Sequence, residues 1–210
     1  MVEKRKKTES YLMRIILVLT LIIILSCSNK KYNETLSNHF NTEQINDFET
    51  INDFFISEAL NGSKSNYKKE FQEFLEDKMF NGYDSFLKKI DFNKQKELYT
   101  TISKSSFDEL WEFCKSRNRN KETFKSICPR QEQNTKFRSY LKELSKSNDF
   151  AKLCLKTIDD NGDYYMLPIQ HYLNVNFESM DLESLDNQFI IAVFYLSEND
   201  SAKRVEKWTD

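Results

Sequence analysis

Cysteine is the residue type in this chain whose chemistry depends most on its surroundings. The 210-residue sequence contains four cysteines. A thiol can carry a lipid, form a disulfide, bind a metal ion or stay buried as a small apolar side chain. Cys27 directly follows an apolar segment near the N-terminus, whereas Cys114, Cys128 and Cys154 lie in the body of the chain. The segments around each thiol therefore decide which chemistry it can undergo.

The N-terminal segment has the organisation of a secretory signal peptide. Residues 1–14 are polar and basic, and residues 15–25 are apolar apart from one threonine. A helix that spans a bilayer needs about 20 apolar residues, so this run is short for a membrane span. A basic start, a short apolar centre and a small residue, Ser26, together predict export and cleavage. The alternative is an uncut membrane anchor, which would leave Cys27 an ordinary cysteine.

The sequence Ile24-Leu25-Ser26-Cys27 resembles a lipobox, the cleavage signal of bacterial lipoproteins, in the looser form of the Bacteroidetes. The resemblance implies that the Cys27 thiol receives diacylglycerol, that the chain is cut before this residue, and that the new amino group is acylated. Ile at the first position and the bulky Leu25 depart from the commonest pattern. Residues 28–31 lack the aspartate or acidic run that the resemblance associates with other destinations. It therefore implies an outer-membrane lipoprotein that faces the periplasm.

The composition of the chain favours helices over extended sheets. Charged residues make up 30% and aromatic residues 14%, and the aromatic fraction argues against disorder. The three glycines and two prolines are too few for the tight turns of sandwiches and barrels, or for phosphate-binding loops. The formal net charge of −2 gives no overall attraction to nucleic acid.

Helix start and stop signals recur along the rest of the chain. Residues 41–44 have the pattern of a capping box, and apolar residues then follow at helical spacing until Gly62. Gly82 and Gly162 end two further apolar periods, as left-handed residues at helix ends commonly do. A hairpin turn is the alternative at Gly162, but the preceding residues fit the helical period better.

The clearest capping box is Ser106-Phe-Asp-Glu109. It predicts a helix with Phe107, Leu110, Trp111 and Cys114 on one apolar face. The stripe is apolar enough to face a core, so we expect Trp111 to be buried as a structural residue.

Beyond Gly162 the periodicity no longer separates helix from strand. Residues 189–196, FIIAVFYL, fit either a buried strand or a buried helix. We therefore predict a mainly α fold, an irregular multi-helix domain. A small β element in its C-terminal third is possible on this pattern, and the sequence does not decide between it and a helix. The expected organisation is a signal peptide in residues 1–26, a lipidated cysteine and flexible tether in 27–41, and one domain in 42–210.

The cysteines of this domain suggest one disulfide. The periplasm is oxidising, and Cys114 and Cys128 end adjacent segments, which makes them the best-placed pair. Sequence alone does not show whether their Cα atoms lie within reach. Cys154 lies on an apolar helix face and is expected to be a buried small side chain.

Basic residues are concentrated in the segment 115–130. One interpretation is a solvated connection between helices, and the other is a patch for lipid headgroups, lipopolysaccharide phosphates or an acidic partner. The residues concerned are Lys115, Arg117, Arg119, Lys121, Lys125 and Arg130.

The sequence contains no recognisable catalytic or metal-binding motif. Cys-x-x-Cys pairs are absent, and His39 and His171 stand alone, so we predict no metal site. G-x-S-x-G, H-E-x-x-H and P-loop patterns are also absent, and no cofactor is expected.

Three hypotheses about function follow from these observations. The first is a non-catalytic helical domain, held to the membrane by its lipid, that binds a ligand or another envelope protein. The second is an immunity-type inhibitor that protects its host from a toxin acting in the envelope. The third is a hydrolase of envelope polymers that uses two carboxylates with pKa values pushed apart. The lack of catalytic motifs favours the first hypothesis.

Lipidation of Cys27 is directly testable. Radiolabelled palmitate should enter the wild-type chain in cells and should be absent from Cys27→Ser, because the thiol is the site of the first acylation. Gel autoradiography of the two proteins measures this. Equal labelling of both proteins would contradict the lipoprotein assignment.

Overall fold

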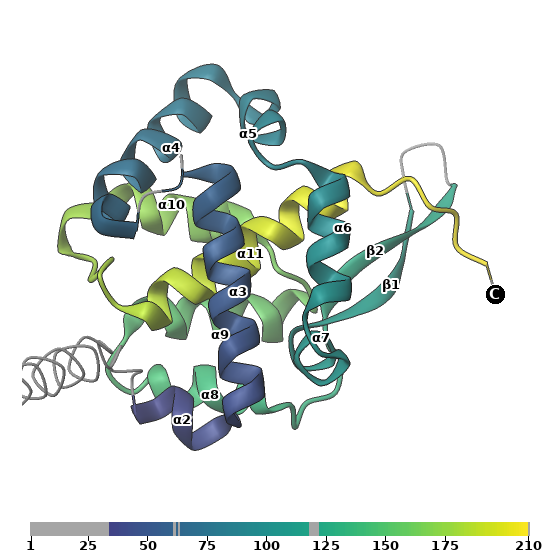
Figure 1. Cartoon of the computed structure of the whole chain (residues 1–210), viewed down its shortest axis with the longest axis horizontal. Helices are drawn as coiled ribbons and strands as arrows, with labels where there is room; N and C mark the ends of the chain where they lie inside the picture. Colours follow the sequence, from purple (N-terminus) through teal and green to yellow (C-terminus); the bar gives the residue numbers. More distant parts are fainter. Residues whose placement is uncertain (1–33, 61, 63, 118–121, 210) are drawn as a thin grey trace, which may run out of the picture. The chain divides into compact units, whose positions relative to one another are not determined.

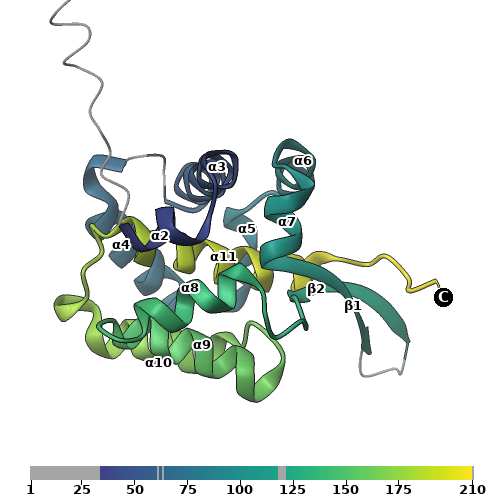
Figure 2. The same cartoon turned by 90° about the horizontal axis from the view of Figure 1, so that it is seen from below.

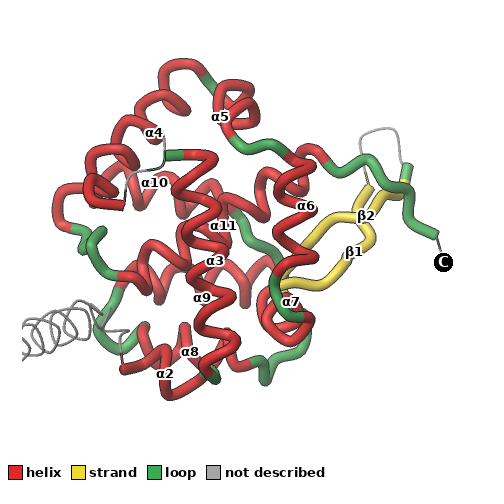
Figure 3. The backbone as a smooth tube through the Cα atoms, in the orientation of Figure 1, coloured by secondary structure: helices red, strands yellow, loops and turns green. Residues whose placement is uncertain are grey.

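The structure is a computed structural model that describes residues 34–60, 62, 64–117 and 122–209. These residues form ten α-helices, two short 3-10 helices and one two-stranded antiparallel sheet (Figures 1 and 3). The predicted mainly α fold with a small β element is confirmed. In chain order the elements are α2 (Glu34–His39), α3 (Thr42–Ala59), η1 (Lys64–Asn66), α4 (Tyr67–Asn81), α5 (Tyr83–Lys89), α6 (Phe92–Thr101), α7 (Lys104–Leu110), β1 (Trp111–Arg117), β2 (Thr123–Pro129), α8 (Lys136–Leu144), α9 (Asp149–Asn161), α10 (Met166–Asn176), η2 (Phe177–Ser179) and α11 (Leu185–Lys203).

Helix α11 lies at the centre of the domain. Every residue from Asp186 to Ser197 is buried, so the FIIAVFYL segment is a helix and not a strand. A helix that is apolar on all faces has to be enclosed on all sides. Its neighbours are α3, α6, α9, α10 and β2. Figure 2 shows α3 and α6 on one side of α11, and α9 and α10 on the other. None of the helices in the described part of the chain is both long enough and apolar enough to span a membrane.

Several predicted helix boundaries are confirmed by the cap geometry. Asn41 and Gln44 form a reciprocal capping box at the start of α3, with the Gln44 amide donating to Asn41 Oδ1 at 2.9 Å. Gly162 ends α9 in the left-handed conformation, with φ +64°. This conformation is the helix cap that the sequence favoured over a hairpin turn.

The helix predicted from the Ser106 capping box is wrong. Helix α7 begins after Ser103, whose hydroxyl accepts from the Ser106 amide at 3.2 Å, and it ends at Leu110. The Ser106 hydroxyl is buried and donates to Asp47 of α3 at 2.6 Å. From Trp111 onwards the chain is strand β1, because pairing with β2 satisfies its backbone groups. The helical spacing of the apolar residues was coincidental, since Trp111 and Cys114 would share one face of a helix but lie on opposite faces of this strand.

The predicted tether is shorter than expected. Residues 34–39 form helix α2, inside the segment 27–41 that we assigned to a flexible linker. Leu36 and Phe40 are buried, and the Phe40 ring packs edge-on against Phe48 at 4.7 Å. Leu36 within this short polar helix and Phe40 directly after it give no detectable period, which explains the error. The predicted signal peptide in residues 1–26 and residues 27–33, including Cys27, lie outside the described residues.

The two strands form a hairpin that extends from the helical part of the domain (Figure 3). Phe113 pairs with Ile127 and Lys115 with Lys125 in its register. The segment after α11 adds to this hairpin, because Lys207 forms a bridge with Phe124. The small β element thus combines the middle of the chain with its C-terminal third.

Trp111 is buried, as predicted, although it lies on a strand. Its side chain is 0% exposed, and its indole N–H donates to the Ser197 hydroxyl at 2.8 Å. The ring also packs against Tyr99 and Phe107, with centroids 5.4 and 5.6 Å away. Trp111 therefore connects the hairpin to α6, α7 and α11.

Trp111→Ala should lower the free energy of unfolding by about 3–5 kcal/mol, because it leaves a large cavity in the core. Denaturant unfolding followed by far-UV circular dichroism measures the loss. Phe80→Ala is the control, since the Phe80 side chain is 76% exposed, and it should have little effect. Equal midpoints for Trp111→Ala and wild type would contradict the core position of Trp111.

Candidate functional site

A pocket with a volume of about 370 Å³ opens on the surface between α5, α10 and α11. Its lining combines aromatic and apolar side chains with polar ones that carry oxygen. Among the described residues, no lysine, arginine or histidine lines it. Tyr83, Tyr164, Tyr165, Met166 and Leu167 form the apolar part, and Asp163, Gln170, Ser197, Glu198 and Ser201 form the polar part.

The turn after α9 supplies three residues of the pocket. Gly162 redirects the chain, and Asp163 Oδ1 then accepts a hydrogen bond from the Tyr164 amide at 2.7 Å. Tyr164 is buried, with its ring centroid 4.9 Å from that of Phe194 on α11. This buried ring anchors the turn, while Asp163 and Tyr165 on either side remain exposed at the pocket.

Glu198 forms a buried ion pair with Lys78 of α4. Lys78 Nζ lies 2.7 Å from Glu198 Oε2, and the two side chains are 4% and 15% exposed. The ammonium also lies over the rings of Phe86 and Tyr195, 4.5 and 4.9 Å from their centroids. Burial lowers the pKa of Lys78 and raises that of Glu198, while their mutual attraction opposes both shifts. The two groups therefore act as one enclosed pair with little net charge.

Two other pocket residues also have shifted pKa values. Burial, and then the negative charge of Glu198, raises the pKa of Tyr83 to about 12. Burial raises the pKa of the Asp163 carboxyl, and the hydrogen bond from the Tyr164 amide opposes this shift. No ion pair of the Asp163 carboxyl occurs in the described part of the chain. The uncompensated negative charge of the pocket thus comes from Asp163.

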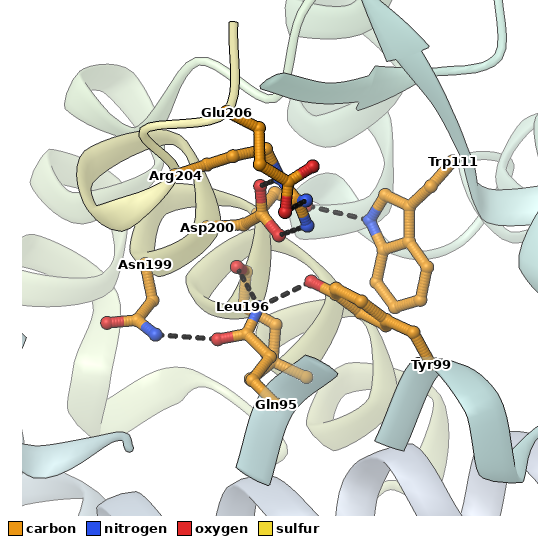
Figure 4. Close-up of polar contacts among 9 residues, drawn as sticks. Gln95, Tyr99, Trp111, Leu196, Asn199, Asp200, Arg204 and Glu206 are labelled. Carbon is orange, nitrogen blue, oxygen red and sulfur yellow. Dashed lines mark hydrogen bonds and ion pairs between the residues drawn. The ribbon is translucent and has the colours of Figure 1, made fainter. Parts of the chain in front are cut away.

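A buried polar network lies beside the pocket at the C-terminal part of α11 (Figure 4). Gln95 of α6 forms a hydrogen bond with Tyr99 and donates to the Leu196 carbonyl at 2.7 Å. Asn199 donates to Gln95 Oε1 at 2.6 Å. Ser197 belongs to both regions, since it accepts from Trp111 and also lines the pocket.

The same network contains a buried ion pair one turn further on. Arg204 Nε and Nη2 donate to the two carboxylate oxygens of Asp200 at 2.7 and 2.6 Å, and Glu206 lies 3.0 Å from Arg204 Nη1. The Asp200 side chain is 0% exposed. Only Asn199 Oδ1 in this network has no hydrogen-bond partner among the described residues. We therefore regard the network as structural, because its charges are already paired and enclosed.

The predicted cysteine pair is a disulfide in the structure. Cys114 on β1 and Cys128 on β2 are bonded, with their Cα atoms 6.0 Å apart. A carboxylate oxygen of Glu112 lies within 4.8 Å of both sulfur atoms. Thiolates bind metals and disulfide sulfurs do not, so this group is no metal site while the bond is intact. Cys154 is buried, as expected, and burial raises the pKa of its thiol.

The structure brings together part of the predicted basic patch. Lys115 and Lys125 are directly paired across the hairpin. Their ammonium groups lie near aromatic rings, Lys115 at 6.0 Å from Trp208 and Lys125 at 5.8 Å from Phe113. Basic and aromatic side chains therefore share one face of the hairpin.

Of the other residues of that patch, Arg130 has side-chain contacts of its own. Arg130 donates to the Asp108 carbonyl at 3.2 Å and pairs with Glu132 at 3.2 Å. Arg117 belongs to β1 by its backbone, and Arg119 and Lys121 lie outside the described residues.

The two histidines lie apart from the pocket lining. His39 Nε2 is 2.8 Å from Glu143 Oε2, which ties α2 to α8. His171 is exposed on α10.

Sequence reasoning did not identify the pocket. Its residues come from α5, the turn after α9, α10 and α11, which are far apart in the sequence. The one usable signal was the grouping of carboxylates and tyrosines around Gly162. Comparison with protein-family models, curated proteins and solved structures found no match for this chain. The geometry of the domain is therefore the basis for its functional assignment.

The Lys78–Glu198 pair gives a pH-dependent prediction. In Lys78→Met, Glu198 loses its cation, so its folded-state pKa rises further above the ordinary 4.5. A raised carboxyl pKa means that stability is lost as pH rises from the unfolded pKa towards the folded pKa. Lys78→Met should therefore cost about 3–5 kcal/mol at pH 7.5 and much less at pH 4.5.

Urea unfolding at the two pH values measures this difference. Lys69→Met on the same helix is the control, since Lys69 is 77% exposed, and it should show no such pH dependence. Adding Glu198→Gln to Lys78→Met should recover most of the loss at pH 7.5. An equal loss at both pH values would show that the Glu198 charge is not the cause.

Proposed function

We propose that this protein is a membrane-anchored, periplasm-facing lipoprotein whose helical domain binds a ligand or a segment of an envelope protein without catalysis. The pocket between α5, α10 and α11 carries the proposal. Its volume of about 370 Å³ lies in the usual range of ligand sites. Tyr165 and Leu167 in its lining are 45% and 68% exposed, so apolar contact area is already presented to solvent.

The anchor supports a position close to the membrane. Only seven Cα–Cα steps separate Cys27 from Glu34, where helix α2 begins. A chain of that length reaches about 25 Å at most. A lipid on Cys27 would therefore keep the domain near the bilayer, and a partner would meet it there. The outer membrane is the membrane that the lipobox resemblance favours.

A carboxylate-dependent hydrolase is the second candidate, because two carboxyl groups, Asp163 and Glu198, line the same pocket. Such a reaction needs one protonated and one ionised group, with pKa values pushed apart. Burial shifts both of these pKa values upwards, and Glu198 is held by Lys78. Binding is therefore the better supported function. Turnover of an envelope polymer that Asp163→Asn abolishes would reverse this preference.

The immunity-type inhibitor is a special case of the same proposal. Its ligand would be a segment of a toxin, held in the pocket or on a neighbouring surface. The identity of the bound partner separates it from other binding functions.

Photo-crosslinking in intact cells tests the pocket directly. A photoreactive amino acid at Leu167 should give a discrete crosslinked product that mass spectrometry identifies. The same amino acid at Val205, which is 87% exposed but outside the pocket lining, should not give this product.

Two matched substitutions on α11 serve as the control. Ser201→Trp should abolish the Leu167 product, because Ser201 lines the pocket and a large side chain there fills it. Ala202→Trp should leave the product unchanged, since Ala202 is exposed and does not line the pocket. Both variants should keep the wild-type circular dichroism. A product that survives Ser201→Trp would place binding elsewhere.

A further inference from the structure

We propose that the pocket takes a single ammonium or guanidinium group carried on an apolar stem. This inference rests on the proposed binding function and names the chemistry of its ligand.

Three polar side chains of the pocket offer acceptors, namely Asp163, Ser197 and Glu198, while Gln170, Ser201 and the tyrosine hydroxyls can donate as well as accept. The Ser197 hydroxyl donates its proton to the Val193 carbonyl at 2.6 Å, so towards a ligand it can only accept. Asp163 Oδ1 is bound by the Tyr164 amide, and Glu198 Oε2 by Lys78, at 2.7 Å each. In the described structure the second oxygen of each carboxyl has no partner. A ligand group that donates several hydrogen bonds fits this arrangement.

The charge of the lining selects a cation. Lys78 compensates Glu198, but no basic group among the described residues pairs with Asp163. The pocket therefore has one uncompensated negative charge. An anion would meet repulsion and no donor from a basic side chain, whereas a monocation would neutralise Asp163.

The aromatic rings of the lining suit the same ligand. A cation within about 6 Å of a ring centroid is attracted by the electrons of the ring face. Tyr83 and Tyr165 line the pocket and are 43% and 45% exposed, so their surfaces are open to a ligand. Met166 and Leu167 add apolar surface for a methylene stem.

Lys78 shows that this part of the domain can hold an alkylammonium group. Its Nζ lies 2.7 Å from Glu198 and within 5.6 Å of the ring centroids of Phe86, Tyr195 and Tyr83. Glu198 and Tyr83 also line the pocket, so a ligand cation there would contact a carboxylate and a tyrosine ring, as the Lys78 ammonium does. The required chemistry is thus already present once within the fold.

Two sources can supply such a group. One is the side chain of a lysine or arginine in a protein segment, and the other is a free amine. Both share the charged head and the apolar stem, so the experiment uses a probe for each. Ac-Ala-Lys-Leu-NH₂ represents the protein segment and pentane-1,5-diamine represents the free amine. Ac-Ala-norleucine-Leu-NH₂ is the neutral control of similar shape.

Methionine methyl NMR of the detergent-solubilised full-length chain reports on binding. Met166 lines the pocket, whereas Met79 lies in the lining of a second pocket between α4 and α10, and Met180 lies in neither. The lysine peptide or the diamine should shift the Met166 methyl signal and leave the other two unchanged. The peptide that contains norleucine should have no effect. The probe with the higher affinity indicates the source of the ligand.

Two isosteric substitutions complete the test. Asp163→Asn should weaken binding about tenfold or more, because it removes the compensating charge. Asp84→Asn, which removes a neighbouring exposed charge outside the pocket, should not. Equal binding of the lysine and norleucine peptides, or no effect of Asp163→Asn, would overturn the cation assignment alone. Absence of any Met166 shift with either probe would also overturn the cation assignment. If, in addition, a photoreactive residue at Leu167 gave no crosslinked product, the proposed binding function would be overturned too.

Discussion

Enclosing α11 is the physical requirement that arranges the other elements of the domain. Apolar side chains project from all faces of this helix between Phe189 and Leu196, so a single covering layer cannot remove them from water. Helices α3 and α6 cover one side, and α9 and α10 cover the other. The helix then becomes polar without becoming exposed, since Asn199 and Asp200 are buried as well. The Asn199 amide is paired with Gln95, because a buried polar group without a hydrogen bond costs free energy. Asp200 is paired with Arg204, because an unpaired charge in this position would cost several kcal/mol.

The pocket depends on the same part of α11. One turn of this helix directs Asn199 and Asp200 into the buried network and presents Ser197, Glu198 and Ser201 to the pocket. The position of the pocket residues is therefore fixed by interactions on the opposite faces of the helix. A binding site built on a helix that is held so firmly is pre-organised, which lowers the entropic cost of binding.

Short sequence patterns predicted much of the helical framework, because the contacts that begin and end a helix join residues close together in the sequence. The capping box at Asn41 and the left-handed Gly162 define helix ends through contacts within a few residues. Strand β1 was missed because its backbone hydrogen bonds are made with β2, and the spacing of apolar residues within one segment carries no information about such a partner. The buried Lys78 and Asp200 were missed for a related reason. A charged residue in a sequence reads as exposed, and only the tertiary structure supplies the partner that allows it to be buried.

The position of α11 along the chain has a consequence for the order of folding. This helix follows every other described helix in the sequence, yet it provides the surface on which α3, α6, α9 and α10 pack. A growing chain therefore presents the surrounding helices before the element that holds them together exists. Until α11 emerges, side chains such as Phe48 and Phe74 lack ring contacts that they make with Phe189 and Tyr195 in the native domain. The apolar side chains that these helices turn towards α11 therefore stay without their native cover until the last described helix has been made.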